Sequence, residues 1–252
     1  MPSTVVHLGF ALLLTAGMMR RAYDRLAVIV VAGAVIFADL DVFTSLVIDG
    51  SHRAMFHTLL LPLFVGTYLY VDTTQRDQSL IQARVGDTGV HLAWVTIAVF
   101  CLSAVGLDLF TAGGVNLFYP LFDQFYAFNC QMTWSSVEGF TQTFVQVAQG
   151  PASSTADSGA GSVSVDVGQK GSTQEYRVRS GVNPSRGPEP DGVERVFPVV
   201  YNGWQTFFAL SGLIITLIKL RGRAHSTSMC HRSPPRGQGE HPSTEPTDTT
   251  DV

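Results

Sequence analysis

Hydrophobic residues along the chain collect in long blocks that are separated by shorter polar stretches. Five blocks approach the length of about 20 apolar residues that a helix needs to cross a bilayer. The predicted membrane helices are Val5–Met19, Leu26–Ile48, Ala54–Val71, Gly89–Phe110 and Gly203–Ile218. The pattern therefore predicts an all-α membrane protein with about five transmembrane helices.

The first block has an alternative interpretation as a signal peptide. Its basic pair, Arg20-Arg21, follows the apolar run, whereas a signal peptide carries its positive charge before that run. No A-x-A cleavage site stands there either. We therefore expect a retained first helix.

Arginine placement predicts the orientation in the membrane. Arg20, Arg21 and Arg25 lie between the first two blocks, Arg76 and Arg84 between the third and fourth, and Arg221 and Arg223 after the fifth. If every block spans, all three groups fall on one side, which the positive-inside rule identifies as the cytoplasm. We expect the N-terminus outside and the C-terminus in the cytoplasm of a multi-pass cell-membrane protein.

The chain divides into four predicted regions. They are a membrane helical domain over 1–125, an extracytoplasmic segment over 126–202, a final transmembrane helix over 203–222 and a disordered cytoplasmic tail over 223–252. In the long outer loop, residues 150–193 are rich in Gly, Ser and Pro. Two alternating stretches there, Ser162–Val167 and Glu175–Arg179, are suited to pair as a small β-hairpin. We expect 150–193 and the tail to contribute little to the fold.

Composition agrees with a membrane protein and excludes one class of partner. Hydrophobic residues make up 46% of the chain and charged residues only 14%, against roughly 25% charged in ordinary soluble proteins. The net charge of −4 leaves no basic surface for nucleic acid. The expected partner is the lipid bilayer.

Six ionisable residues lie within or beside the apolar blocks, where such groups are costly. An Asp at the centre of a membrane helix costs roughly 2.5–3.5 kcal/mol on insertion scales. In the expected orientation all six come near the outer face, and they are His7, Asp39, Asp41, His52, His57 and Asp108. Histidine nitrogen and carboxylate oxygen are the usual ligands of zinc, manganese and iron. The set predicts a divalent metal site, with zinc or manganese as the favoured ions.

Local spacing leaves two roles open within this set. Asp39 and Asp41, two residues apart, would diverge by about 200° on a regular helix. Either the helix unwinds there, or one Asp binds while the other serves a second metal or supports a ligand. Arg53 and His57 share a helical face, so Arg53 either clamps a phosphate or carboxylate or extends to the membrane interface.

The same residues carry a resemblance to a known family. The start Met1-Pro2-Ser3-Thr4-Val5-Val6-His7, the step Ala38-Asp39-Leu40-Asp41, the stretch His52-Arg53-x-x-x-His57-Thr58 and the segment Asp108-Leu109-Phe110-Thr111-Ala112-Gly113-Gly114-Val115 resemble membrane-bound, metal-dependent hydrolases, which include LexA-regulated inner-membrane proteins. The resemblance covers about residues 1–125. It departs from the family pattern at Ala38, in place of a Pro, and at Ala104, where a late His is expected.

Residues and resemblance together predict a metal-dependent hydrolase at the extracytoplasmic face. A metal-activated water would attack an ester or phosphoester bond, for which a lipid or envelope substrate suits the location. Asp41 is the candidate general base and Arg53 the candidate group that stabilises anionic charge. The alternative, which Ala104 favours, is a non-catalytic membrane protein with a structural polar or metal cluster.

Overall fold

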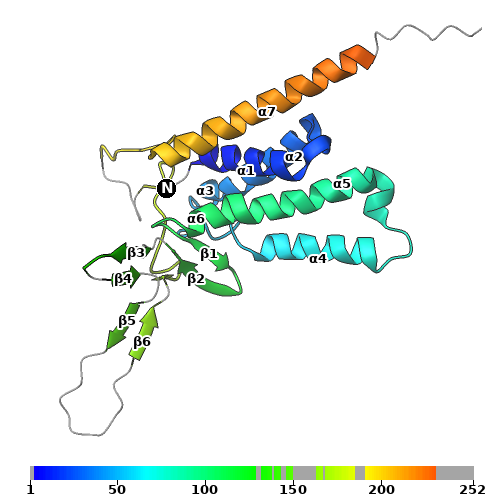
Figure 1. Ribbon diagram of the computed structural model, residues 1–252. Coiled ribbons are helices and arrows are strands. Elements are labelled where there is room, and N and C mark those ends of the chain that lie inside the picture. Colours follow the sequence, from blue (N-terminus) through cyan, green and yellow to red (C-terminus); the bar gives the residue numbers. More distant parts are fainter. Residues whose placement is uncertain are drawn as a thin grey trace, which may run out of the picture.

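The computed structural model is an elongated bundle of helices with small strands gathered at one end (Figure 1). It describes residues 3–128, 132–137, 139–142, 146–149, 163–166, 168–184 and 191–230. Its helices are α1 (Thr4–Met18), η1 (Arg20–Ala22), α2 (Arg25–Asp39), α3 (Asp41–Thr44), α4 (Leu60–Thr74), α5 (Leu80–Val99), the π-helical η2 (Phe100–Gly106), α6 (Leu107–Leu109) and α7 (Gly203–Cys230).

Three stretches of the described helices, where five were expected, are long and apolar enough to cross a membrane. They are Arg25–Thr44, Leu80–Leu109 and Gly203–Arg223. The expected span Val5–Met19 is a 15-residue helix, and Ala54–Val71 is helical only from Leu60. At 1.5 Å per residue, 15 residues reach about 22 Å, which is less than the hydrocarbon thickness of about 30 Å. The structure therefore shows three described helices of full spanning length, while α1 and α4 are shorter than a full span.

The third expected span is short because its first part folds as an irregular loop. Residues 51–59 form turns, and Arg53 has a φ of 62°. The backbone of Arg53 is fixed on both sides, since its N–H donates to Asp41 Oδ2 at 2.9 Å and its carbonyl accepts from Asn116 N at 2.9 Å. A non-glycine residue in this conformation costs of order 1–3 kcal/mol and persists where its surroundings fix it.

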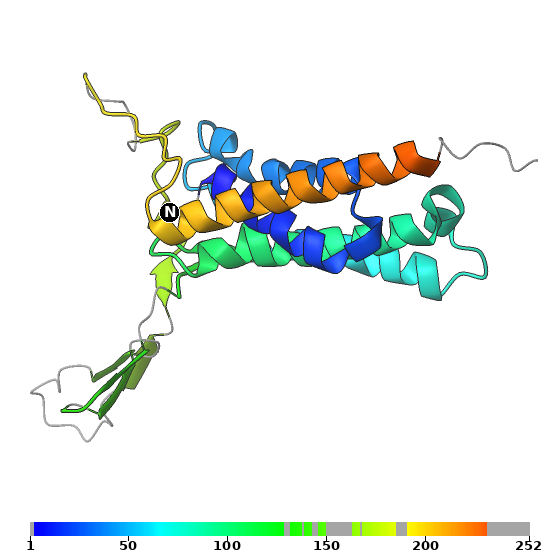
Figure 2. The same cartoon turned by 45° about the horizontal axis from the view of Figure 1, so that its top comes forward.

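Helix α7 packs against α1 through small residues, although the two helices are separated by most of the chain. The two helices lie side by side in Figures 1 and 2. A Cβ placed on Gly212 would lie 1.9 Å from the carbonyl oxygen of Gly9, and one on Gly9 would lie 2.4 Å from the Cα of Ala209. Such close backbone approach is how helices associate in lipid, where no hydrophobic force drives them together.

Seven strands form three small antiparallel sheets in the described part of the chain, and they correct two sequence predictions. The strands are β1 (Val115–Phe118), β2 (Phe122–Tyr126), β3 (Met132–Ser135), β4 (Gly139–Gln142), β5 (Gln146–Gln149), β6 (Val163–Asp166) and β7 (Gln169–Gly171), in the orders β1-β2-β7, β3-β4 and β5-β6. The chain is therefore not purely α-helical. The expected hairpin is wrong as well, because β6 pairs with β5, and Gln169–Gly171, which lie between the two expected strands, form β7 and pair with β2.

The segment after β7 returns to the helices and takes part in the fold. Asn183 Nδ2 donates to the carbonyl of Ser45 at 2.7 Å, and Arg177 forms an ion pair with Asp49 at 2.8 Å. The expectation that 150–193 contributes little is therefore wrong for its described part after β7; residues 150–162, 167 and 185–190 lie outside the described residues. The tail expected from 223 begins as the last turns of α7, which continues to Cys230, and residues 231–252 lie outside the described residues.

Candidate functional site

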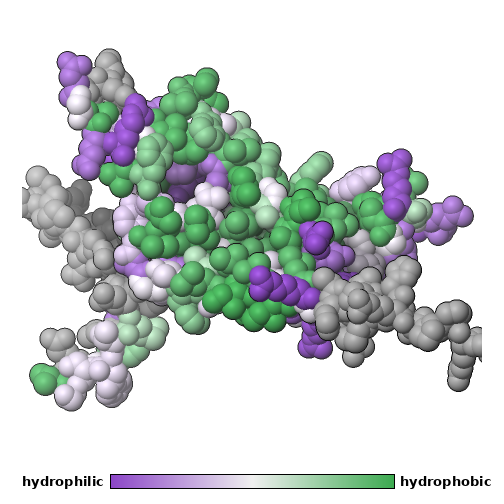
Figure 3. Space-filling model, turned by 90° about the horizontal axis from the view of Figure 1, so that it is seen from above, coloured by the Kyte–Doolittle hydropathy of each residue, from purple (hydrophilic) through white to green (hydrophobic). Residues whose placement is uncertain are grey.

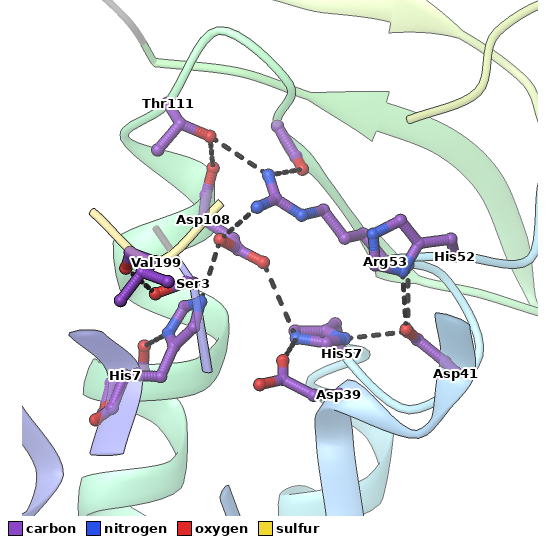
Figure 4. Close-up of polar contacts among 12 residues, drawn as sticks. Ser3, His7, Asp39, Asp41, His52, Arg53, His57, Asp108, Thr111 and Val199 are labelled. Atoms are coloured by element: carbon purple, nitrogen blue, oxygen red, sulfur yellow. Dashed lines mark hydrogen bonds and ion pairs between the residues drawn. The ribbon is translucent and has the colours of Figure 1, made fainter. Parts of the chain in front are cut away.

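The structure brings all six predicted ligand residues and Arg53 together at the strand-bearing end of the bundle (Figure 4). They come from four helices and one loop. His7 belongs to α1, Asp39 ends α2, Asp41 begins α3, and Asp108 lies in α6. His52, Arg53 and His57 lie in the loop before α4. We call these seven residues the polar cluster.

A break between α2 and α3 lets both early aspartates face the cluster. Helix α2 ends at Asp39 and α3 begins at Asp41, with Leu40 between them. The carboxylates therefore avoid the divergence of a continuous helix. Asp41 is fully buried, whereas the side chain of Asp39 is 20% exposed. Of the two sequence alternatives, the helix does unwind, and the two aspartates also have different surroundings.

Asp41 organises the loop that carries the histidines. Its Oδ1 accepts from His52 Nδ1 at 2.9 Å, while its Oδ2 accepts from His57 Nδ1 at 2.8 Å and from the backbone N–H of Arg53. Because both oxygens are engaged, this carboxylate fixes the positions of the two imidazoles. The sequence predicted Asp41 and His52 as metal ligands. In the structure, Asp41 instead bonds the Nδ1 atoms of His57 and His52, so its oxygens are used to hold these two imidazoles.

His57 is completely buried and presents its second nitrogen to two other carboxylates. Its Nε2 lies 3.4 Å from Asp39 Oδ1 and 3.5 Å from Asp108 Oδ2. Burial lowers the pKa of this imidazole, but the neighbouring carboxylates, Asp41 foremost, outweigh burial and raise the pKa of His57 to about 10. The carboxylates around His57 therefore favour the protonated form of its imidazole.

His7 is oriented in the same manner from the opposite side. Its Nδ1–H donates to the carbonyl of Ser103 at 2.6 Å, and the Ser103 hydroxyl donates back to the carbonyl of His7 at 2.6 Å. Its Nε2 then lies 3.2 Å from Asp108 Oδ1. Two buried imidazoles thus direct their Nε2 atoms at carboxylate oxygens.

Arg53 is buried and its guanidinium is already engaged. Nη2 lies 2.8 Å from Asp108 Oδ1, and Nη1 donates to Thr111 Oγ1 at 3.2 Å. The guanidinium therefore neutralises and positions Asp108, which is a different role from the phosphate clamp considered from sequence.

Three buried polar atoms of the cluster have no hydrogen bond of good geometry, although Asp108 Oδ1 keeps its ion-pair contact with Arg53. They are Asp39 Oδ2, His57 Nε2 and Asp108 Oδ1. Buried polar atoms are normally satisfied, so each such exception requires an explanation. Across the described chain, however, no three His, Cys, Asp or Glu side chains are already arranged around one point as a formed metal shell. A cation would require the side chains to turn toward it, although the separations of 3.4 and 3.5 Å at His57 Nε2 are within the ~4.5 Å allowed to atoms that share an ion.

Five residues of the polar cluster form the polar floor of a cavity of about 910 Å³, and they are His7, Asp39, His52, Arg53 and Asp108; Asp41 and His57 do not line it. Asp39, His52 and Asp108 are among the polar lining residues, while the walls are mostly apolar. One wall comes from the end of α2 and from α3, and the other from the returning segment between 179 and 201. The volume lies at the upper end of the ~300–1,000 Å³ of small-molecule sites.

The family model for the YdjM inner membrane protein matches residues 1–163. The chain belongs to the YdjM family. This membership and the three long apolar helices identify a membrane protein. Comparisons with curated proteins and with solved structures found no match. The part that matches the YdjM family model contains the whole polar cluster, whereas one cavity wall and α7 lie beyond it.

Two residues that orient the polar cluster were not predicted from the sequence. A third position, where the family pattern has a His, is closely packed. Ser103 orients His7 through its backbone carbonyl, which every residue has, and through its hydroxyl. A serine in an apolar segment does not by itself indicate such a role. Thr111 stands in the D-x-x-T stretch and bonds both Arg53 and the carbonyl of Asp108. Ala104, four residues before Asp108 in this YdjM family member, is fully buried among Ala38 and Phe100. It lies in η2, and π-helical turns recur at functional sites.

Proposed function

We propose that this YdjM family member is a membrane-bound, metal-dependent hydrolase of ester or phosphoester bonds. Its reaction centre would be the polar cluster at the floor of the cavity. The observation that carries the proposal is the arrangement of the two buried histidines, His7 and His57, around Asp108.

Each histidine has its proton position fixed by its neighbour. Nδ1 of His7 faces a carbonyl oxygen and Nδ1 of His57 faces the Asp41 carboxylate, and both oxygens only accept hydrogen bonds. Both Nδ1 atoms must therefore carry hydrogen. In a neutral imidazole Nε2 then bears a lone pair, which would face carboxylate lone pairs at 3.2–3.5 Å. Repulsion between them is relieved only when protons or a cation lie between these atoms.

The charge balance of the cluster also requires either added protons or a cation. Asp39, Asp41 and Asp108 carry three negative charges, and Arg53 supplies one positive charge. Two negative charges therefore stay uncompensated in a buried site when the imidazoles are neutral, which is costly. Two protons or one divalent cation would neutralise the cluster. A carboxylate behind a metal-binding histidine, as Asp41 is behind His57, is the usual support for such a ligand.

The candidate ligands are His57 Nε2, His7 Nε2, Asp39 and Asp108, whose donor atoms suit zinc or manganese. A bound ion of this kind polarises the scissile bond and makes a bound water nucleophilic at neutral pH. In this proposal Asp41 is a positioning residue for His57, and Arg53 keeps Asp108 ionised and in place. His52, which lines the cavity and bonds Asp41, is suited to carry a proton to or from a substrate.

Hydrolysis by the purified full chain tests the proposal. We expect turnover of a chromogenic carboxylic or phosphate ester that is lost after chelation and restored by zinc or manganese. His52→Ala should lower turnover by about 10²–10⁴-fold and leave the metal content unchanged, because general acid–base catalysis contributes this much. His91→Ala, in α5 and outside the polar cluster, is the matched control. Metal-independent turnover, or none with either ester class in the metal-loaded protein, would contradict the proposed reaction.

Asp41→Asn tests whether this carboxylate supports a ligand. The change keeps the shape but weakens the acceptor for His57 Nδ1–H, and it should reduce metal affinity by about 10–100-fold. Titration of zinc into chelator-treated protein gives the measurement. Asp123→Asn, which removes a carboxylate bonded to Thr173 outside the polar cluster, should leave the affinity unchanged. Equal affinities of Asp41→Asn and the wild type would remove the supporting role.

The non-catalytic alternative rests on the direct contacts within the cluster. Asp108 already pairs with Arg53 and faces His7, so the same residues can join α1, α6 and the 51–59 loop without a reaction. In that case the protein would retain its fold with chelator and give no turnover. The hydrolysis assay therefore separates the two functions.

We also propose that the polar cluster faces the extracytoplasmic side. The α1–α2 turn, the α4–α5 connection and the far end of α7 carry the three arginine groups, and these elements gather at the bundle end opposite the strands (Figure 1). Positive-inside bias assigns that end to the cytoplasm. In a variant without native cysteines, Asp191→Cys should react with a membrane-impermeant maleimide in intact cells, whereas Asp77→Cys should react only after lysis. The reverse pattern would overturn the orientation.

A further inference from the structure

The cavity above the polar cluster combines a polar floor with apolar walls. His7, Asp39 and Asp108 lie at the floor, and the apolar side chains of Leu40, Phe43 and Phe197 line the same cavity. Seen from above, hydrophilic residues lie in a hollow bordered by hydrophobic ones (Figure 3). A ligand that satisfies both parts has a polar head and an apolar body.

The apolar wall is continuous with a surface that a bilayer would cover. Leu40 is 42% exposed and Phe43 is 57% exposed, and both lie near the C-terminal end of the candidate span Arg25–Thr44. Exposed apolar area of this kind costs about 25 cal/mol per Å² in water, a cost that is absent in lipid. Leu40 and Phe43 thus belong both to the cavity lining and to a helix suited to a bilayer, an arrangement that favours an amphiphilic ligand.

The second wall is tied to the helices and lies beyond the part of the chain that matches the YdjM family. Asn183 bonds the carbonyl of Ser45, and Ser3 Oγ donates to the carbonyl of Val199 beside α1. The backbone N–H of Tyr201 donates to Gln205 Oε1 of α7 at 2.7 Å. These contacts hold the wall over the cluster, in residues that the family match over 1–163 does not include.

We propose that this cavity binds a membrane lipid, with its ester or phosphoester head at the polar cluster and an acyl chain between the two apolar walls. The residues 193–201, which we call the outer wall, select the apolar part. The reaction on the head rests on the function proposed above, whereas binding of the lipid does not. The substrate class is thus an amphiphile of the bilayer and not a water-soluble ester.

Photo-crosslinking tests lipid binding without requiring turnover. The probe is a phosphatidylglycerol with a diazirine at the end of one acyl chain, in vesicles of phosphatidylethanolamine and phosphatidylglycerol that contain the full chain. We expect labelling of the outer wall, which lies outside the spanning helices. Val42→Trp places an indole in the cavity and should reduce outer-wall labelling several-fold. Val65→Trp, on the exposed side of α4, is the matched control and should leave it unchanged.

Two further measurements complete the experiment. Competition with glycerol phosphate tests whether the acyl chain is needed for binding, and chelator treatment separates lipid binding from the proposed hydrolysis. Excess glycerol phosphate, which has the head chemistry without a chain, should not compete with the probe, and competition by it would overturn the acyl-chain role. Outer-wall labelling that is absent, or that Val42→Trp leaves unchanged, would overturn lipid binding. Chelator treatment should preserve labelling. Labelling without metal-dependent turnover would uphold the lipid site and remove only the proposed reaction.

Discussion

Gly212→Val is expected to separate α7 from α1 and to cause the largest loss of stability of any single substitution considered in the membrane helices. A Cβ at this position would lie 1.9 Å from the carbonyl oxygen of Gly9 and 2.6 Å from its carbonyl carbon. Backbone atoms cannot rotate away as a side chain does, so the helices must move apart. Overpacking of this kind typically costs 1–3 kcal/mol, and a clash with backbone belongs at or above the upper end.

The expected loss has a measurable size and a matched control. About 3 kcal/mol corresponds to a decrease of roughly 6–12 °C in Tm for a chain of this size, measured by thermal unfolding in detergent. Gly222→Val lies on the same helix, where a Cβ would meet nothing within 4 Å, and should change Tm little. If both variants lower Tm equally, the close contact of α1 and α7 is wrong.

Separation of α7 should also affect the other contacts between these helices. Tyr23 and Thr216 share a hydrogen bond of 2.5 Å, and Lys219 Nζ donates to the carbonyls of Ala16 and Arg20 near the end of α1. A cation at carbonyls that end a helix is favourable. Because α1 also carries His7, loosening α7 should disturb the polar cluster indirectly. Gly212→Val should therefore lower metal affinity as well as Tm.

The membrane class and the membership of the polar cluster were predictable from the sequence for physical reasons. Long apolar blocks with few charges indicate membrane helices, and this prediction is confirmed. Asp39, His57 and Asp108 stood out because a lipid-facing helix does not tolerate unpaired ionisable groups, so they had to find partners. The structure brings them together, while their roles as ligands stay a prediction.

The errors arise where long-range contacts decide the local structure. Residues 54–59 look apolar enough to begin a span, but Asp41 draws the loop that contains them into turns around its carboxylate. The alternating stretch that forms β6 found its partner in β5, which precedes it in the chain, and no local pattern encodes that choice. The outer wall is mostly apolar but irregular, and no local pattern in residues 193–201 indicates that it lines a cavity with the polar cluster.

His57→Ala is expected to abolish metal binding. His57 is the only residue of the described cluster that faces both Asp39 and Asp108 with one atom, so its loss removes the centre of the proposed ligand set. The variant also leaves buried carboxylates without a partner, which lowers stability. Asp39→Asn is therefore the companion variant. Asp39 is partly exposed and should tolerate an amide, yet it should also lose the metal because it would no longer supply a carboxylate.

The most direct test of the metal-dependent site is the metal content of the purified full chain, measured by elemental mass spectrometry after dialysis against zinc or manganese. We expect about one divalent ion per chain in the wild type and in the control His91→Ala. We expect substantially less than one ion in His57→Ala and in folded Asp39→Asn. A wild-type protein without bound metal, or an Asp39→Asn variant that retains its ion, would contradict the account.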